Sequence, residues 1–99
     1  MGCHQYWGSE MIFISLGKFR KKPTKENTTE VSKITQAMAK KEGIKFIGFY
    51  WTLGRYDTIV IMEAPDEKTA MKVNLSVNEF VSTETMVGIP REQAIKLIS

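Results

Sequence analysis

The sequence contains one cysteine, one histidine and no long hydrophobic run. Cys3 alone cannot form an internal disulfide, and no signal-peptide pattern precedes the first apolar segment, so we expect a cytoplasmic protein. Because the only histidine, His4, lies near the N-terminus, we expect no haem, zinc or other cofactor in the folded part. Apolar runs such as residues 11–14 are much shorter than the roughly 18 residues of a membrane-spanning helix, which excludes an integral membrane protein.

The chain is also short, with 99 residues, of which 42% are hydrophobic and 25% are charged. This composition is typical of one globular domain. Residues 1–10 show no hydrophobic periodicity, so we expect a flexible extension followed by a single domain over residues 11–99. A domain of this size buries only about two-thirds of its unfolded surface, and an apolar sheet face left over favours a partner subunit. We therefore expect a homodimer or a higher oligomer.

Acidic residues are slightly outnumbered, with 11 acidic against 14 basic residues and a net charge of +3. The excess lies in one segment that contains Lys18, Arg20, Lys21, Lys22 and Lys25. Such a segment can hold phosphate or nucleic acid, but nucleic-acid modules add stacked aromatic residues or a recognition helix, and this sequence shows neither. We interpret the segment as a solvated loop and expect no nucleic-acid partner.

Hydrophobic periodicity predicts the element order β-α-β-β-α-β, followed by a short helix. The predicted strands cover residues 11–16, 44–53, 56–63 and 81–87. The predicted helices cover residues 28–42, a segment that starts at residues 65–67, and a segment that starts at residue 90. This order predicts an α+β, ferredoxin-like fold, in which an antiparallel sheet carries the helices on one face.

Local residue patterns predict where the helices begin and end. Asn27, with Glu30 three residues later, is typical of a helix N-cap, so the first helix is predicted to begin near residue 28. Gly43 favours the left-handed conformation that ends a helix. Pro65 and Asp66 are typical of the start of the second helix, since proline suits the first turn and an acid suits its positive end.

Residues 44–63 are predicted to form a β-hairpin with a two-residue turn at Gly54 and Arg55, which places Leu53 opposite Tyr56. Strand alternation then divides the hairpin into two faces. The predicted helix-covered face carries Ile47, Phe49, Trp51, Leu53, Tyr56, Thr58, Val60 and Met62. The other face carries Phe46, Gly48, Tyr50, Thr52, Asp57, Ile59, Ile61 and Glu63. The apolar members of this second face would be exposed together, so we expect a second copy of the chain to cover it.

The space between two such sheets is the predicted site for a small apolar or aromatic ligand. Its candidate ligand-binding residues are Phe46, Tyr50, Thr52, Arg55, Asp57 and Glu63. Asp57 and Tyr50 are also the candidate catalytic residues, because a desolvated carboxylate can take a proton at neutral pH. The alternative for Asp57 is structural, since an aspartate beside a turn often accepts hydrogen bonds or pairs with an arginine such as Arg55. The aromatic residues Tyr50, Trp51 and Tyr56 suit either a pocket or the core.

The segment Thr52-Leu53-Gly54-Arg55-Tyr56-Asp57, together with residues 63–70 and the later Thr83-Glu84-Thr85, resembles the GYD domain family, which is named for a Gly-x-Tyr-Asp-type motif. The resemblance runs over residues 11–98. It implies a dimeric α/β-barrel, in which two ferredoxin-like subunits pack sheet against sheet. The wider superfamily includes cofactor-free monooxygenases, lactone isomerases, haem enzymes and sensing domains, so the resemblance implies a fold and does not select a chemistry.

Three functions remain open from the sequence. The first is a small homo-oligomeric protein that binds an apolar or aromatic molecule between or behind its sheets. The second is a cofactor-independent oxygenase or isomerase that uses Asp57 and Tyr50. The third is a regulatory ligand-sensing module, against which the sequence offers no DNA-binding segment.

Overall fold

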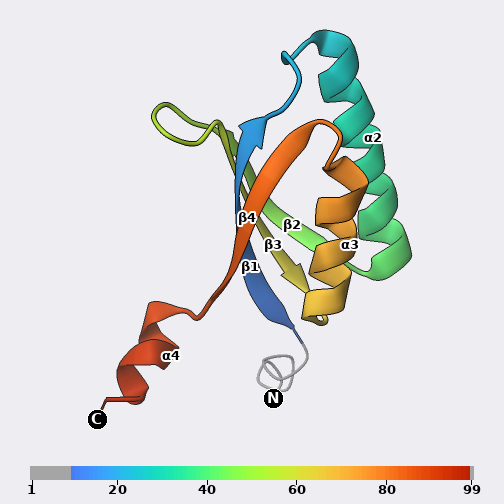
Figure 1. Ribbon diagram of the computed structural model, residues 1–99. Helices are drawn as coiled ribbons and strands as arrows, with labels where there is room; N and C mark the ends of the chain where they lie inside the picture. Colours follow the sequence, from blue (N-terminus) through green and yellow to red (C-terminus); the bar gives the residue numbers. More distant parts are fainter. Residues whose placement is uncertain (1–9, 99) are drawn as a thin grey trace.

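The structure is a computed structural model that describes residues 10–98, so the predicted extension at residues 1–10 lies almost entirely outside the described residues. The order β-α-β-β-α-β with a final helix is confirmed, and α2 and α3 cover the same face of the sheet (Figure 1). The elements are β1 (Met11–Phe19), α2 (Lys25–Glu42), β2 (Lys45–Trp51), β3 (Thr58–Ala64), α3 (Glu67–Val77), β4 (Val81–Gly88) and α4 (Arg91–Lys96).

The four strands form one antiparallel sheet in the order β2-β3-β1-β4, so β1 and β3 are central and β2 and β4 are the edges. This order is the ferredoxin-like arrangement that the sequence predicts. Side chains alternate between the two faces of each strand, and the helix-covered face carries the core. The buried core cluster consists of Phe13, Ile44, Met62, Ala64, Ala70 and Val73.

Helix α2 begins three residues earlier than its sequence pattern predicts. Its N-cap is Thr24, whose hydroxyl accepts a hydrogen bond from Asn27 N at 3.0 Å. The prediction of Asn27 as the cap is wrong because this amide side chain instead donates to Lys22 O at 3.0 Å. The predicted end of the helix is confirmed: Gly43 adopts a left-handed conformation, with φ 70°, and its N–H bonds to Ala39 O.

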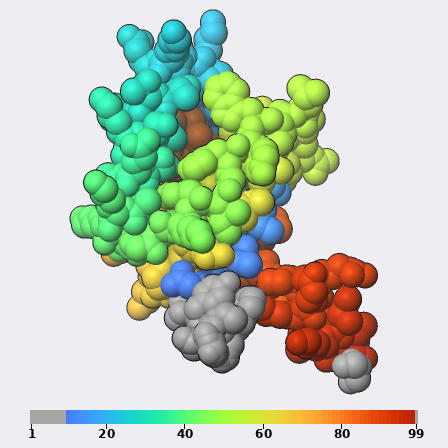
Figure 2. Space-filling view, turned by 180° about the vertical axis from the view of Figure 1, so that it is seen from behind, coloured from blue at the N-terminus to red at the C-terminus, as the bar shows by residue number. Residues whose placement is uncertain are grey.

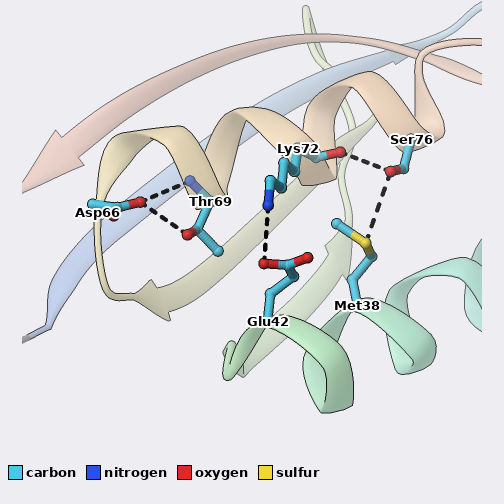
Figure 3. A network of polar contacts seen from close by, with 6 residues as sticks. All are labelled: Met38, Glu42, Asp66, Thr69, Lys72 and Ser76. Atoms are coloured by element: carbon cyan, nitrogen blue, oxygen red, sulfur yellow. Dashed lines mark hydrogen bonds and ion pairs between the residues drawn. The ribbon is translucent and has the colours of Figure 1, made fainter.

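Helices α2 and α3 are joined along their outer side by polar contacts (Figure 3). Lys72 Nζ lies 3.2 Å from Glu42 Oε1, and Ser76 Oγ lies 3.9 Å from Met38 Sδ. At the start of α3, Asp66 caps the helix by accepting from both the N–H and the hydroxyl of Thr69, at 2.9 and 2.8 Å. Both bonds lower the pKa of Asp66 below its ordinary value, and the bond from the Thr69 N–H has the larger effect.

Replacing Asp66 with alanine is expected to lower the melting temperature at neutral pH, because α3 loses its cap. The folded protein lowers the pKa of Asp66, so the stabilisation is complete above its unfolded pKa and is lost as the pH falls through the folded value. Melting curves recorded from neutral to strongly acidic pH should therefore converge for the wild type and Asp66→Ala. Asp66→Asn, which retains a cap, is the control; a gap between wild type and Asp66→Ala that does not change with pH would contradict the role of the charge.

The β2–β3 hairpin differs from its prediction at both ends. Its connection spans residues 52–57, with Gly54 at φ 101°, and replaces the predicted two-residue turn. The predicted register near this connection is confirmed, since Trp51 pairs with Thr58 and Thr52 N donates to Asp57 O. A bulge between Phe46 and Gly48 then shifts the register by one residue. It moves Phe46 onto the helix-covered face, against the core, whereas Ile47 stays exposed.

Tyr56 lies on the face opposite to the predicted one. The backbone leaves the strand before Thr58, so simple alternation does not apply at Tyr56. Its hydroxyl donates to Glu84 Oε1 at 3.0 Å, and Glu84 lies on the side of β4 that faces away from the helices. The prediction that Tyr56 is anchored in the helix-facing core is therefore wrong.

The face of the sheet that α2 and α3 leave uncovered is apolar in its centre. We call it the open face; its apolar residues are Ile12, Ile14, Leu16, Tyr50, Ile59, Ile61 and Met86. Helix α4 projects away from the sheet on this side (Figure 1). Ile95 in α4 is exposed, and so are Leu97 and Ile98, which follow the helix. Both features leave apolar surface that a single chain does not cover.

Candidate functional site

A cavity of about 130 Å³ lies between the helix-covered face of the sheet and helices α2 and α3. It opens between α2 and β2, where Figure 2 shows a hollow between their surfaces. The lining is almost entirely apolar, and an apolar cavity of about 150 Å³ is known to hold benzene. The space therefore suits a ring-sized apolar group. The apolar lining residues include Phe19, Val31, Phe46, Phe49, Trp51, Val60, Met62, Val73 and Val77.

Aromatic side chains form the wall of the cavity at the β2 edge of the sheet, and we call this the aromatic wall. Phe46 and Phe49 are stacked, with ring centroids 5.1 Å apart and planes at 28°. Trp51 meets Phe19 edge to face, with centroids 5.3 Å apart. Phe49 and Trp51 are 56% and 64% exposed although they face the cavity, so the wall presents ring surface to whatever enters.

A cluster of three polar side chains lies on the opposite side, where β1, β4 and α3 meet, and we call it the polar cluster. Asn74 Nδ2 donates to Thr85 Oγ1 at 2.8 Å, and the hydroxyls of Ser15 and Thr85 are 2.6 Å apart. Ser15 Oγ also donates to Asn74 Oδ1, over a longer 3.4 Å. Ser15 and Asn74 line the cavity. The three side chains come from three separate elements; Ser15 is buried, and Asn74 and Thr85 are half-buried.

Lys21 lies at the edge of the cavity, in the basic segment, and it is already paired. Its Nζ is 2.6 Å from Glu79 Oε2 and 5.1 Å from the centre of the Phe80 ring. Arg20, its neighbour, donates to Asn78 Oδ1 at 3.3 Å. Two of the five basic residues of this segment therefore bind to the turn after α3, which gives them a role within the fold.

The residues predicted as a site do not come together in one place. Phe46 lines the cavity. Tyr50 borders it, but its ring lies over Gly48 on the open face, where an added Cβ would be 2.7 Å from Tyr50 Cε2. The hydroxyl of Thr52 donates to Tyr56 O at 2.6 Å, which holds the 52–57 connection. The remaining candidates lie elsewhere: Glu63 is opposite Lys45 in the β2–β3 register on the open face, and Arg55 is exposed at the loop tip.

Asp57 joins the 52–57 connection to the end of β1. Its Oδ2 accepts a hydrogen bond from Phe19 N at 2.9 Å, and its own N–H donates to Gly17 O at 2.8 Å. The side chain is half-buried and is not part of the cavity lining. This geometry is the structural alternative that the sequence leaves open for Asp57, with a backbone amide as the partner in place of Arg55.

Replacing Asp57 with alanine is expected to lower the free energy of unfolding by about 1–3 kcal/mol, because the Phe19 amide loses its acceptor in a half-buried position. Asp57→Asn should cost less, since the amide oxygen still accepts, but the bond loses its charge. Urea unfolding of the three proteins measures the order. Unchanged stability of Asp57→Ala combined with lost ligand binding would assign Asp57 to the site instead.

The sequence left open a site behind the sheet, but sequence reasoning missed the polar cluster and most of the residues that line the cavity. The available signal was polar residues at core-facing positions: Ser15 follows the buried Phe13 by two residues in β1, and Asn74 follows the buried Val73 in α3.

Among residues 10–98, no three His, Cys, Asp or Glu side chains are grouped as a metal site, and no helix is long and apolar enough to cross a membrane. His4 lies outside that range.

The chain is a ferredoxin-like α+β domain with a cavity between its sheet and its two helices. It is a member of the GYD domain family, whose model matches residues 13–98. This match confirms the resemblance carried by the Gly54-to-Asp57 segment. No curated protein matches the sequence.

Solved structures with the same fold are distant in sequence. SnoaB, a cofactor-independent oxygenase from Streptomyces nogalater, is 12% identical with a TM-score of 0.55, over 84% of this chain and 94% of SnoaB. AsnC of E. coli is 15% identical with a TM-score of 0.51, over 88% of this chain and 55% of AsnC. MtbAldR is 12% identical with a TM-score of 0.53, over 80% and 51%. The chain thus spans about half the length of the last two, and these likenesses establish the fold alone.

Proposed function

We propose that this protein is a homo-oligomeric binding protein that holds an apolar or aromatic small molecule in the cavity behind its sheet. The observation that carries the proposal is the cavity itself, which has an aromatic wall and lies open to solvent between α2 and β2. Burial of one aromatic ring there would remove apolar surface from water on both partners. Phe46 is the ligand contact that this proposal shares with the sequence prediction, since the Tyr50 ring lies on the open face.

Self-association through the open face is the second part of the proposal. Two central pairs, Ile14 with Ile61 and Leu16 with Ile59, lie side by side in register on this face. A single chain leaves this strip without a covering layer, and the same strip on a second copy would match it around a two-fold axis. The dimeric α/β-barrel that the resemblance to the GYD domain family implies, with two subunits packed sheet against sheet, supports this arrangement. We also place the protein in the cytoplasm, because its single cysteine suits a reducing compartment.

A cofactor-independent oxygenase or isomerase is the second candidate, because SnoaB is an oxygenase of that kind and shares this fold over most of its length. Such a reaction needs a group that takes a proton from the substrate within hydrogen-bond reach. Asp57 is bonded to Phe19 N and does not line the cavity. Binding is therefore better supported than catalysis by the residues around the cavity.

Replacing Val31 with phenylalanine is expected to weaken binding of toluene, used as a single-ring probe, by at least about tenfold, because the added ring occupies the cavity. Met71→Phe places the same ring on an exposed part of α3 and should bind toluene like the wild type. Chemical-shift titration by ¹H–¹⁵N NMR measures affinity and location together. Shifts confined to the open face, or none at all, would contradict the proposal.

A further inference from the structure

The polar cluster has one hydrogen-bond donor that its own members do not use. When Ser15 donates to Asn74 Oδ1, the hydroxyl of Thr85 donates to Ser15, and both hydroxyl protons are used. One N–H of the Asn74 carboxamide goes to Thr85 Oγ1. The other N–H has no partner among the described residues, and Asn74 lines the cavity. This N–H of the half-buried Asn74 is therefore available to a ligand oxygen.

We propose that Asn74 selects the ligand, and that the ligand class is an uncharged aromatic or alicyclic molecule with one carbonyl or hydroxyl oxygen. This proposal rests on the cavity being the binding site. The ring lies against the aromatic wall at the β2 edge, and the oxygen accepts from Asn74 at the side of β1 and β4. In the sheet, β3 lies between β2 and β1, so the aromatic wall and Asn74 are on opposite sides of the cavity. A ligand with one apolar and one polar end therefore binds in one orientation.

The charges around the cavity determine that the ligand is uncharged. Among the lining residues in the described part of the chain, Lys21 is the only charged one, and Glu79 already neutralises it at 2.6 Å. A carboxylate or ammonium group on the ligand would lose its water without gaining an ionic partner, which costs far more than one hydrogen bond returns. A neutral oxygen needs only the donor that Asn74 has to offer.

Two probes of nearly the same shape test this selection: acetophenone, which has a C=O group, and α-methylstyrene, which has a C=CH₂ group in its place. In Asn74→Leu, acetophenone should bind at least about tenfold more weakly, because its carbonyl is buried without a donor, whereas α-methylstyrene should bind as well as before or better. Thr35→Val is the matched control, since the Thr35 hydroxyl also borders the cavity but donates to Ser32 O within its own helix. The ratio of the two dissociation constants should be unchanged there.

The wild type supplies a second measurement, which holds even if Asn74→Leu does not fold. In ¹H–¹⁵N spectra, acetophenone should shift the side-chain amide pair of Asn74, and α-methylstyrene should leave it nearly unshifted. Equal effects of both probes on this amide, or an unchanged ratio of affinities in Asn74→Leu, would overturn the role of Asn74 while leaving the cavity as a binding site. If neither probe binds, the proposed function falls as well, and the two failures are thereby distinguished.

Discussion

Replacing Ile61 with lysine is expected to separate the proposed dimer into folded monomers. Ile61 pairs with Ile14 at the centre of the open face, so a two-fold interface would bury two new ammonium groups close together. An unpaired buried charge costs several kcal/mol, and two of them should raise the dissociation constant at least about 100-fold. In the monomer the lysine is solvated, and the fold therefore has little reason to change.

Sedimentation velocity over a range of protein concentrations measures this effect, and far-UV circular dichroism confirms that the variant is folded. Met71→Lys is the matched control, because Met71 is 60% exposed on α3, away from the open face. It should associate like the wild type. A wild type that stays monomeric at all concentrations, or an Ile61→Lys protein that still dimerises, would refute the interface.

Replacing Met62 with alanine is expected to reduce the free energy of unfolding by about 2–5 kcal/mol. Met62 is 0% exposed, sits in the core cluster and faces Phe13 across the central strand pair, so its removal leaves a void between sheet and helices. A domain of this kind has only about 5–15 kcal/mol of stability in total, so the loss is a large share of it.

Urea unfolding measures the change, and Leu75→Ala, at a position that is 68% exposed, should cost less than about 1 kcal/mol. Met62 also lines the cavity, so the void in Met62→Ala enlarges the space for a ligand. Toluene should then stabilise Met62→Ala more than it stabilises the wild type. Similar losses for Met62→Ala and Leu75→Ala would contradict the core position of Met62.

The fold could be predicted from the sequence because its signals are local. Alternating residues in β1 and β3 and helical spacing in α2 and α3 fix the elements. Gly43 marks the end of α2 and Asp66 the start of α3, whereas Pro65 lies before the cap and not in the first turn. The site could not be predicted in the same way, because its parts meet only in three dimensions. Ser15, Asn74 and Thr85 are separated by up to 70 positions along the chain, and no local pattern connects them.

The site hypothesis depended on assigning residues to faces, and this assignment is sensitive to single residues. The register near Gly54 is as predicted, yet Phe46 and Tyr56 both lie on faces opposite to those expected. A bulge beside Gly48 and a longer connection around Gly54 are responsible. A glycine permits such an irregularity but does not specify how many residues it inserts. The partner of Asp57 was also unpredictable. Its carboxylate accepts from Phe19 N, a backbone group at the far end of β1, and side-chain patterns in the sequence do not reveal bonds to the backbone.

The bulge in β2 gives the cavity its character. Strand alternation alone would send side chains three positions apart to opposite sides of the sheet, so Phe46 and Phe49 could not stack in a regular strand. The extra residue, Ile47, restores them to the same side, where their rings stack. The number of residues in β2 thus decides whether Phe46 faces the cavity, and with it how aromatic the cavity surface is. This effect of strand length on ligand binding is separate from the identity of the side chains.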